Sequence, residues 1–127
     1  HAGRSIAVIP GIFHITYVQN TGAAFGIFKG NNVGLAVIAL LIIISVLVAF
    51  ILSRDRETLY QASLALILGG STGNIIDRIF RGYVVDFLDF RFWPVFNLAD
   101  SLINVGFFLL VIHILFSKGR KNASDNI

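Results

Sequence analysis

The sequence predicts a polytopic α-helical membrane protein, with three transmembrane helices in this chain and a small β-sheet at the membrane surface. Of the 127 residues, 56% are apolar and only 13% are charged, whereas an average protein carries about 25% charged residues. Three uncharged stretches are long enough to cross a bilayer. The chain length indicates one domain.

The three predicted spans are residues 33–52, 59–79 and 100–117. The first is uncharged and almost wholly apolar, and its length as a helix is about 30 Å, the thickness of the hydrocarbon layer. The second contains Gly69 and Gly73, small residues whose spacing lets another helix approach closely.

Two polar residues within these spans need a structural explanation. Asn74 lies in the second one, where a buried amide needs hydrogen-bond partners. Asp100 opens the third span, and we expect it to be the helix N-cap.

Residues 1–32 read as a β segment. The run 12–18 (IFHITYV) is rich in β-branched and aromatic residues and predicts a strand, and Pro10-Gly11 before it is typical of a turn. We expect this segment and residues 80–99 to lie outside the cytoplasm.

Positive charges set the orientation of membrane proteins, and in this chain they are evenly divided between the two faces. Because Arg78 and Arg81 lie among the aspartates and can pair with them, we discount both. The loop 53–58 and the polar tail 118–127 are then cytoplasmic. A basic tail also favours contact with anionic lipid headgroups.

Four of the seven acidic residues gather between the second and third spans: Asp77, Asp86, Asp89 and Asp100. Carboxylates beside a membrane core are costly and usually functional. Two carboxylates about 3 Å apart share one proton, so that one can accept a proton from water while the other donates to a substrate carbonyl. Spacing alone leaves open whether Asp100 pairs with Asp77, Asp86 or Asp89.

Each acid also has a structural interpretation. Asp77 beside Arg78 is typical of an interfacial ion pair. Asp86 lies between apolar residues, which raises a carboxyl pKa, although it can also be a surface acid on an amphipathic stretch. Asp89 is expected to be the more solvated acid.

Other chemistry has little support. The absence of cysteine excludes thiol catalysis and cysteine-bound metals, and no ligand spacing predicts a metal site. His1, His14 and His113 are scattered, and we expect His113 to be a packing or interhelical hydrogen-bond residue. We expect no cofactor, no metal and no nucleic-acid partner.

Four motifs, taken together and in order, make the chain similar to a known family. They are residues 20–26 (NTGAAFG), 69–78 (GGSTGNIIDR), 84–87 (VVDF) and 96–101 (FNLADS). The chain resembles the bacterial lipoprotein signal peptidases, or signal peptidase II, from about Ile6 to Phe116.

The resemblance implies a membrane aspartyl endopeptidase that removes the signal peptide of prolipoproteins just before a diacylglyceryl-modified cysteine. It places the catalytic pair on Asp86 and Asp100, at the outer face of the bacterial plasma membrane. The residues that it implies as substrate-binding or supporting are Asn20, Gly22, Asn74, Asp77, Arg78 and Asn97.

Members of this family have four transmembrane helices, the first of which precedes the β segment. We therefore expect this sequence to be a fragment that lacks that helix, and we expect a monomer whose partners are the lipid-modified prolipoprotein and membrane lipid. The alternative functions are a transport or proton-conducting subunit, which intramembrane acids also suit, and a non-catalytic scaffold that uses Gly69 and Gly73 as its contact site.

Overall fold

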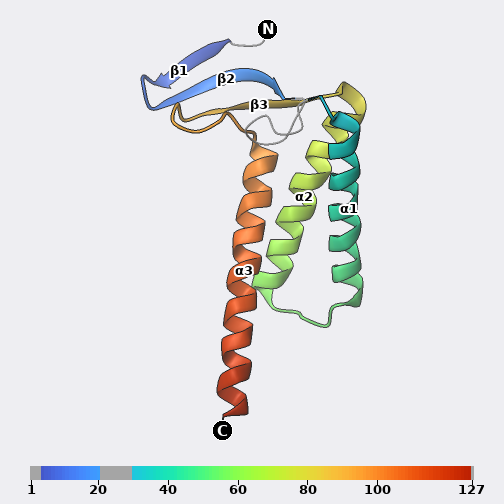
Figure 1. Cartoon of the computed structure of the whole chain (residues 1–127). Helices are drawn as coiled ribbons and strands as arrows, with labels where there is room; N and C mark the ends of the chain where they lie inside the picture. The colour runs from blue at the N-terminus through green and yellow to red at the C-terminus, as the bar shows by residue number, and fades with distance from the viewer. Residues whose placement is uncertain (1–3, 21–29, 127) are drawn as a thin grey trace.

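The computed structural model describes residues 4–20 and 30–126, and within them three helices stand side by side under a three-stranded sheet (Figure 1). The helices are α1 (Asn32–Leu52), α2 (Thr58–Arg81) and α3 (Leu98–Asp125). The strands are β1 (Ser5–Ile9), β2 (Phe13–Asn20) and β3 (Val84–Asp89).

The sheet is antiparallel, in the order β1-β2-β3. Pro10 and Gly11 form the turn between β1 and β2, closed by a hydrogen bond of 2.9 Å from Ile12 N to Ile9 O. Gly11 has a φ of 75°, which glycine adopts without strain at the third position of such a turn. β2 covers most of the run 12–18 that the sequence predicts as a strand.

The pairing of β2 with β3 contains an irregularity that sets the position of the acidic residues. Ile15 pairs with Leu88, but Val18 pairs with Asp86, so β2 has one extra residue between these two pairs. A bulge of this kind bends a strand and redirects side chains. The register that follows puts Asn20 opposite Val84, close to Asp86.

Two of the helices, α1 and α3, are long and apolar enough to cross a membrane, within the part of the chain that the structure describes. In their most apolar stretches only 6% and 11% of residues are buried within the protein, so their apolar side chains face outward, as they do towards lipid. α2 is not apolar enough along its length to be counted with them. It lies between α1 and α3 and contacts both (Figure 1). Because protein covers it on both sides, α2 accommodates buried Ser63, Ser71 and Arg78.

Glycines let α2 and α3 approach each other closely, but they are not the two that the sequence indicates. Nothing lies within 4 Å of a methyl group placed on Gly69, and one on Gly73 makes only an ordinary contact with Ala99. The close approaches occur at Gly70 and Gly106. A methyl group on Gly70 would fall against Ala99 O and 2.6 Å from Ile103 Cγ1, and one on Gly106 would lie 2.8 Å from Ser63 O.

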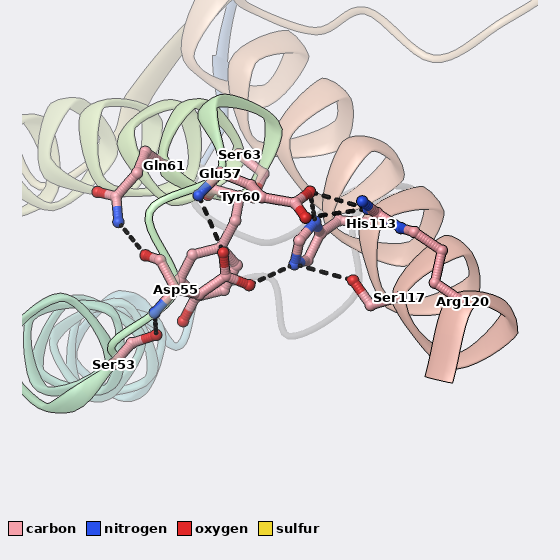
Figure 2. Close-up of polar contacts among 9 residues, drawn as sticks. All are labelled: Ser53, Asp55, Glu57, Tyr60, Gln61, Ser63, His113, Ser117 and Arg120. Carbon is pink, nitrogen blue, oxygen red and sulfur yellow. Dashed lines mark hydrogen bonds and ion pairs between the residues drawn. The ribbon is translucent and has the colours of Figure 1, made fainter. Parts of the chain in front are cut away.

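A polar cluster fixes α3 to the α1–α2 loop at the end of the bundle away from the sheet (Figure 2). His113 is 4% exposed, and its Nε2 lies 2.7 Å from Asp55 Oδ2 and 3.4 Å from Ser117 Oγ. Glu57 lies 3.4 Å from His113 Nδ1 and forms an ion pair with Arg120. The sequence predicts His113 as a packing or interhelical hydrogen-bond residue; it is buried, but its hydrogen bonds among the described residues reach the α1–α2 loop and its own helix and not a second helix.

This cluster is not a serine triad, although it contains the residue types of one. Glu57 does lie on the opposite ring nitrogen, but Asp55 lies 2.7 Å from Nε2 and Ser117 Oγ only 3.4 Å from it. A carboxylate thus occupies the nitrogen that would have to accept the proton of a nucleophilic serine. The polar residues from Lys118 to Asp125, predicted as a tail beyond the span, continue α3 as helix.

Replacement of Gly70 by alanine is expected to destabilise the protein, because its methyl group would collide with backbone and force α2 and α3 apart. Overpacking of this kind costs about 1–3 kcal/mol. Gly69→Ala is the matched control, one residue away in the same helix with open space around it. We expect Gly69→Ala to keep or raise the melting temperature in detergent and Gly70→Ala to lower it; equal melting temperatures would contradict the packing described.

Candidate active site

Side chains from four elements meet where the sheet joins the helices. Asp86 lies on β3 and Asp100 in the first turn of α3, and each accepts a hydrogen bond from an asparagine of another element. Asn20, at the end of β2, donates to Asp86 Oδ2 at 2.8 Å. Asn74, on α2, donates to Asp100 Oδ1 at 2.9 Å.

Asn97 connects these two pairs. Its Nδ2 donates to Asp86 Oδ1 at 3.0 Å and to Asn74 Oδ1 at 3.3 Å, while its Oδ1 accepts from the backbone N of Asp100 at 2.8 Å. Asn97 is therefore the N-cap of α3, and the prediction that Asp100 caps this helix is wrong. Asp100 instead lies within the first turn, where the positive end of the helix dipole favours a negative charge.

Burial is the main influence on the charge of Asp86. Its side chain is 2% exposed, and desolvation raises the pKa of Asp86 above its ordinary value, with the nearby charge of Asp100 adding to the effect. The hydrogen bonds from Asn20 and Asn97 and the charge of Arg78 act in the opposite direction and are outweighed. Asp86 is thus a carboxyl group that keeps its proton more readily than an exposed aspartate does.

Arg78 contributes a buried positive charge to the same region. It interacts electrostatically with Asp100 and Asp86, and its Nη1 donates to Asn32 Oδ1 at 3.3 Å while Asn32 Nδ2 donates back to Arg78 O at 3.0 Å. This exchange joins the start of α1 to the end of α2. The predicted ion pair of Asp77 with Arg78 is not formed, since the ion pairs between described residues do not include it.

Asp89 is not the solvated acid that the sequence predicts. It is 5% exposed and accepts from Thr16 Oγ1 at 2.7 Å, from Arg91 N at 2.9 Å and from Arg91 Nη1 at 3.1 Å. These contacts, the Thr16 hydroxyl first, hold the pKa of Asp89 below its ordinary value. Asp89 therefore ties β2 to β3.

The contacts described above do not include two predicted site residues, and they include two residues that were not predicted. Gly22 lies outside the described residues, and Asp77 takes no part in the hydrogen bonds among the described residues of the site. Sequence reasoning missed Thr16 and Asn32, because a threonine in a strand and an asparagine at a helix start each have an ordinary local explanation. Within residues 4–20 and 30–126, no three His, Cys, Asp or Glu side chains gather as metal ligands.

Comparison with known proteins identifies the family. The family model described as signal peptidase (SPase) II matches residues 1–116. The chain belongs to the signal peptidase II family. It is 48% identical to a lipoprotein signal peptidase of Halothermothrix orenii over 87% of this chain and 76% of the relative. It is 46% identical to one of Pelotomaculum thermopropionicum, over 97% of this chain and 81% of that protein.

A solved structure agrees with this assignment. A structure described as a bacterial membrane enzyme matches with a TM-score of 0.89 and 35% identity, over 95% of this chain and 76% of that one. The chain therefore has the membrane-enzyme fold of signal peptidase II and is a peptidase by family. The alternative of a transport or proton-conducting subunit is not supported by these matches.

Replacing Asn97 with alanine is expected to lower the free energy of unfolding of this signal peptidase II family member. Loss of the N-cap costs about 1 kcal/mol, and leaving an oxygen of buried Asp86 without its donor costs about 1–3 kcal/mol. Thermal unfolding in detergent measures the difference. Asn122→Ala, an exposed asparagine near the end of α3, is the control; an equal effect of both variants would contradict the bridging role of Asn97.

Proposed function

We propose that this chain is an aspartic endopeptidase that cleaves the signal peptide of lipid-modified prolipoproteins, with Asp86 and Asp100 as the catalytic pair. The observation that carries the proposal is the shared amide network. Asn97 donates to Asp86 and to Asn74, and Asn74 donates to the carboxyl group of Asp100. Both carboxyl groups therefore belong to one hydrogen-bond network.

The environments of the two acids support different roles. Burial raises the pKa of Asp86, which favours Asp86 as the member of the pair that donates a proton. Asp100, in the first turn of α3, lies where a negative charge is favoured and acts as the base. A difference in surroundings of this kind is the usual basis for assigning acid and base in a carboxyl pair.

The reaction then proceeds through a tetrahedral intermediate. The carboxylate of Asp100 takes a proton from water, whose oxygen bonds to the carbonyl carbon, while Asp86 gives its proton to the carbonyl oxygen. When the intermediate collapses, the carbon–nitrogen bond breaks and the nitrogen receives the proton held by Asp100. Asp86 regains its own proton from the hydroxyl of the intermediate as the carbonyl reforms.

A lipid-bearing substrate fits the surroundings of the pair. A groove of about 500 Å³ lies between α1 and α2 beside Arg78, and its lining is mainly aliphatic, with Val33, Val37 and Ile79 among its residues. An apolar wall next to a polar site suits a cysteine that carries acyl chains. The relatives named lipoprotein signal peptidases support the same class of substrate.

We place the protein in the bacterial plasma membrane as a multi-pass monomer, with α1, α2 and α3 as spans and the catalytic pair at the extracytoplasmic face. The basic residues at the end away from the sheet that form no ion pair among the described residues support this orientation: Arg54, Arg56, Lys118 and Lys121. At the sheet end, Arg91 is neutralised by Asp89 and Arg78 is buried with the pair, so both weigh little in the count.

Conversion of either catalytic acid to its amide is expected to abolish cleavage. Asp86→Asn and Asp100→Asn each remove a proton-transfer group, and general acid–base catalysis contributes about 10²–10⁴-fold to rate. The assay follows the mobility shift of a diacylglyceryl-modified prolipoprotein incubated with the enzyme. Asp125→Asn is the matched control, because Asp125 is an exposed acid at the far end of α3. Normal cleavage by either active-site variant would contradict the assignment of Asp86 and Asp100 as the catalytic pair.

The proposed roles also predict how the pH dependence of activity changes when Asn20 is replaced by alanine. Activity falls on the alkaline side as Asp86 loses its proton, and the hydrogen bond from Asn20 lowers the pKa of Asp86. Without this donor the charged form is less stable, so the proton is kept to a higher pH. The alkaline limb of kcat/KM is expected to move to higher pH.

The measurement is the pH profile of kcat/KM for the Asn20→Ala variant beside wild-type enzyme, with Asn122→Ala as the control. A limb that stays in place or moves to lower pH would contradict Asp86 as the acid that holds the proton.

A further inference from the structure

The segment between β3 and α3 exposes two large aromatic side chains at a turn that is firmly held. Phe92 is 83% exposed and Trp93 is 55% exposed. We call these two residues the aromatic tip. In a small protein, apolar side chains of this size at a fixed turn are informative because they mark a surface that meets something other than water.

The turn is strained, and neighbouring groups maintain it. Arg91 has a φ of 67°, which is unusual for a residue other than glycine. Phe92 N donates to Phe90 O at 2.8 Å, which closes a three-residue turn around Arg91. Asp89 holds Arg91 through both its backbone N and its guanidinium.

An aromatic cluster fixes the base of the same turn. Phe90 lies 4.9 Å from Phe13 of β2 and 6.0 Å from Phe96, measured between ring centroids. Phe96 also pairs with Leu88 on the edge of β3 that faces away from β2. Strain persists only where the surroundings over-determine it, and here it fixes the backbone of the turn while Phe92 and Trp93 remain largely exposed.

The position of the turn identifies what the tip meets. The segment turns back beneath the sheet, on the side where the helices lie, and runs directly into α3 (Figure 1). Leu98, the first residue of α3, is 59% exposed, so the apolar surface of this helix begins at its first turn. The segment that carries the tip thus lies on the helix side of the sheet and leads into the end of α3 that we place at the outer membrane surface (Figure 1).

We propose that Phe92 and Trp93 insert into the outer leaflet at the headgroup level and anchor the sheet to the lipid surface. Tryptophan and other aromatic residues favour this level because one end is apolar and the other polar. The ion pair of Arg91 with Asp89 neutralises the charge beside the tip, so its entry into the interface leaves no isolated charge to desolvate. The inference rests on the proposed placement of α3 across the membrane, and is independent of the catalytic assignment.

Trp93 is the single tryptophan of this sequence and reports its own surroundings. The protein is reconstituted into phosphatidylethanolamine/phosphatidylglycerol vesicles whose chains carry bromine either near the ester or near the chain end, and aqueous iodide is used as the opposite quencher. We expect bromine near the ester to quench Trp93 several-fold more than bromine near the chain end, and iodide to quench it several-fold less than in unfolded protein. Efficient iodide quenching with no effect of brominated lipid would overturn the proposal.

Two relocated tryptophans, each in a Trp93→Phe background, give the reference depths. Phe108→Trp lies on the exposed face of α3 about 15 Å beyond its start, and should be quenched most by bromine near the chain end. Ile6→Trp lies on β1, the strand farthest from the helices (Figure 1), and should remain accessible to iodide.

The outcomes separate the possible errors. If tryptophan at position 108 is not quenched by deep bromine, the proposed membrane placement fails and the anchor with it. If it is quenched but Trp93 is not, only the anchor fails. Equal quenching by brominated lipid at positions 6 and 93 would show that the whole sheet contacts lipid, and would overturn the proposal that the aromatic tip is the anchor. Protection of Trp93 from both quenchers would indicate that the tip contacts protein and not lipid, and would overturn the proposal.

Discussion

The arrangement of the site depends on the side chain of Asn97. One amide caps α3, donates to the buried carboxyl group of Asp86 and contacts Asn74 on α2. A buried carboxyl group without donors would be costly, and here the donors come from two separate elements. Because the same amide begins the helix that carries Asp100, the position of one acid relative to the other is fixed by a residue that belongs to neither strand nor helix core.

Close packing of α2 against α3 is the second requirement. Asn74 reaches Asp100 only because Gly70 lets Ala99 and Ile103 approach α2 directly. A second glycine, Gly106, repeats the contact farther along against Ser63 and Ile67. Packing between small residues is the usual way for helices to associate where lipid offers no hydrophobic force, and in this protein it also sets the geometry of the polar site above it.

The sequence was sufficient for the three helices and for β2, but not for β1, for β3 or for the partners of the site residues. The lengths of the apolar stretches predict α1 and α3, and the β-branched run predicts β2, because each signal is local. Which acid faces Asp100 depends on the bulge in β2 and on the pairing of Val18 with Asp86, which no local pattern encodes. The roles of Asp100 and Asn97 at the start of α3 were likewise misassigned, since both residue types suit an N-cap and they lie three positions apart. Spacing left the partner of Asp100 open, and Asp86 in that role is what the family resemblance implies.

The two acids of β3 show how partners, more than residue type, decide the behaviour of a carboxyl group. Asp86 and Asp89 are three residues apart on the same strand and both are buried, at 2% and 5% exposure. The pKa of Asp86 is raised, mainly by burial, because its asparagine donors are outweighed. The pKa of Asp89 is lowered because Thr16 and both donors of Arg91 stabilise its charge. One strand thus carries an acid that retains its proton beside Asp100 and another whose fixed charge holds the adjoining turn, and the bulge in β2 serves both.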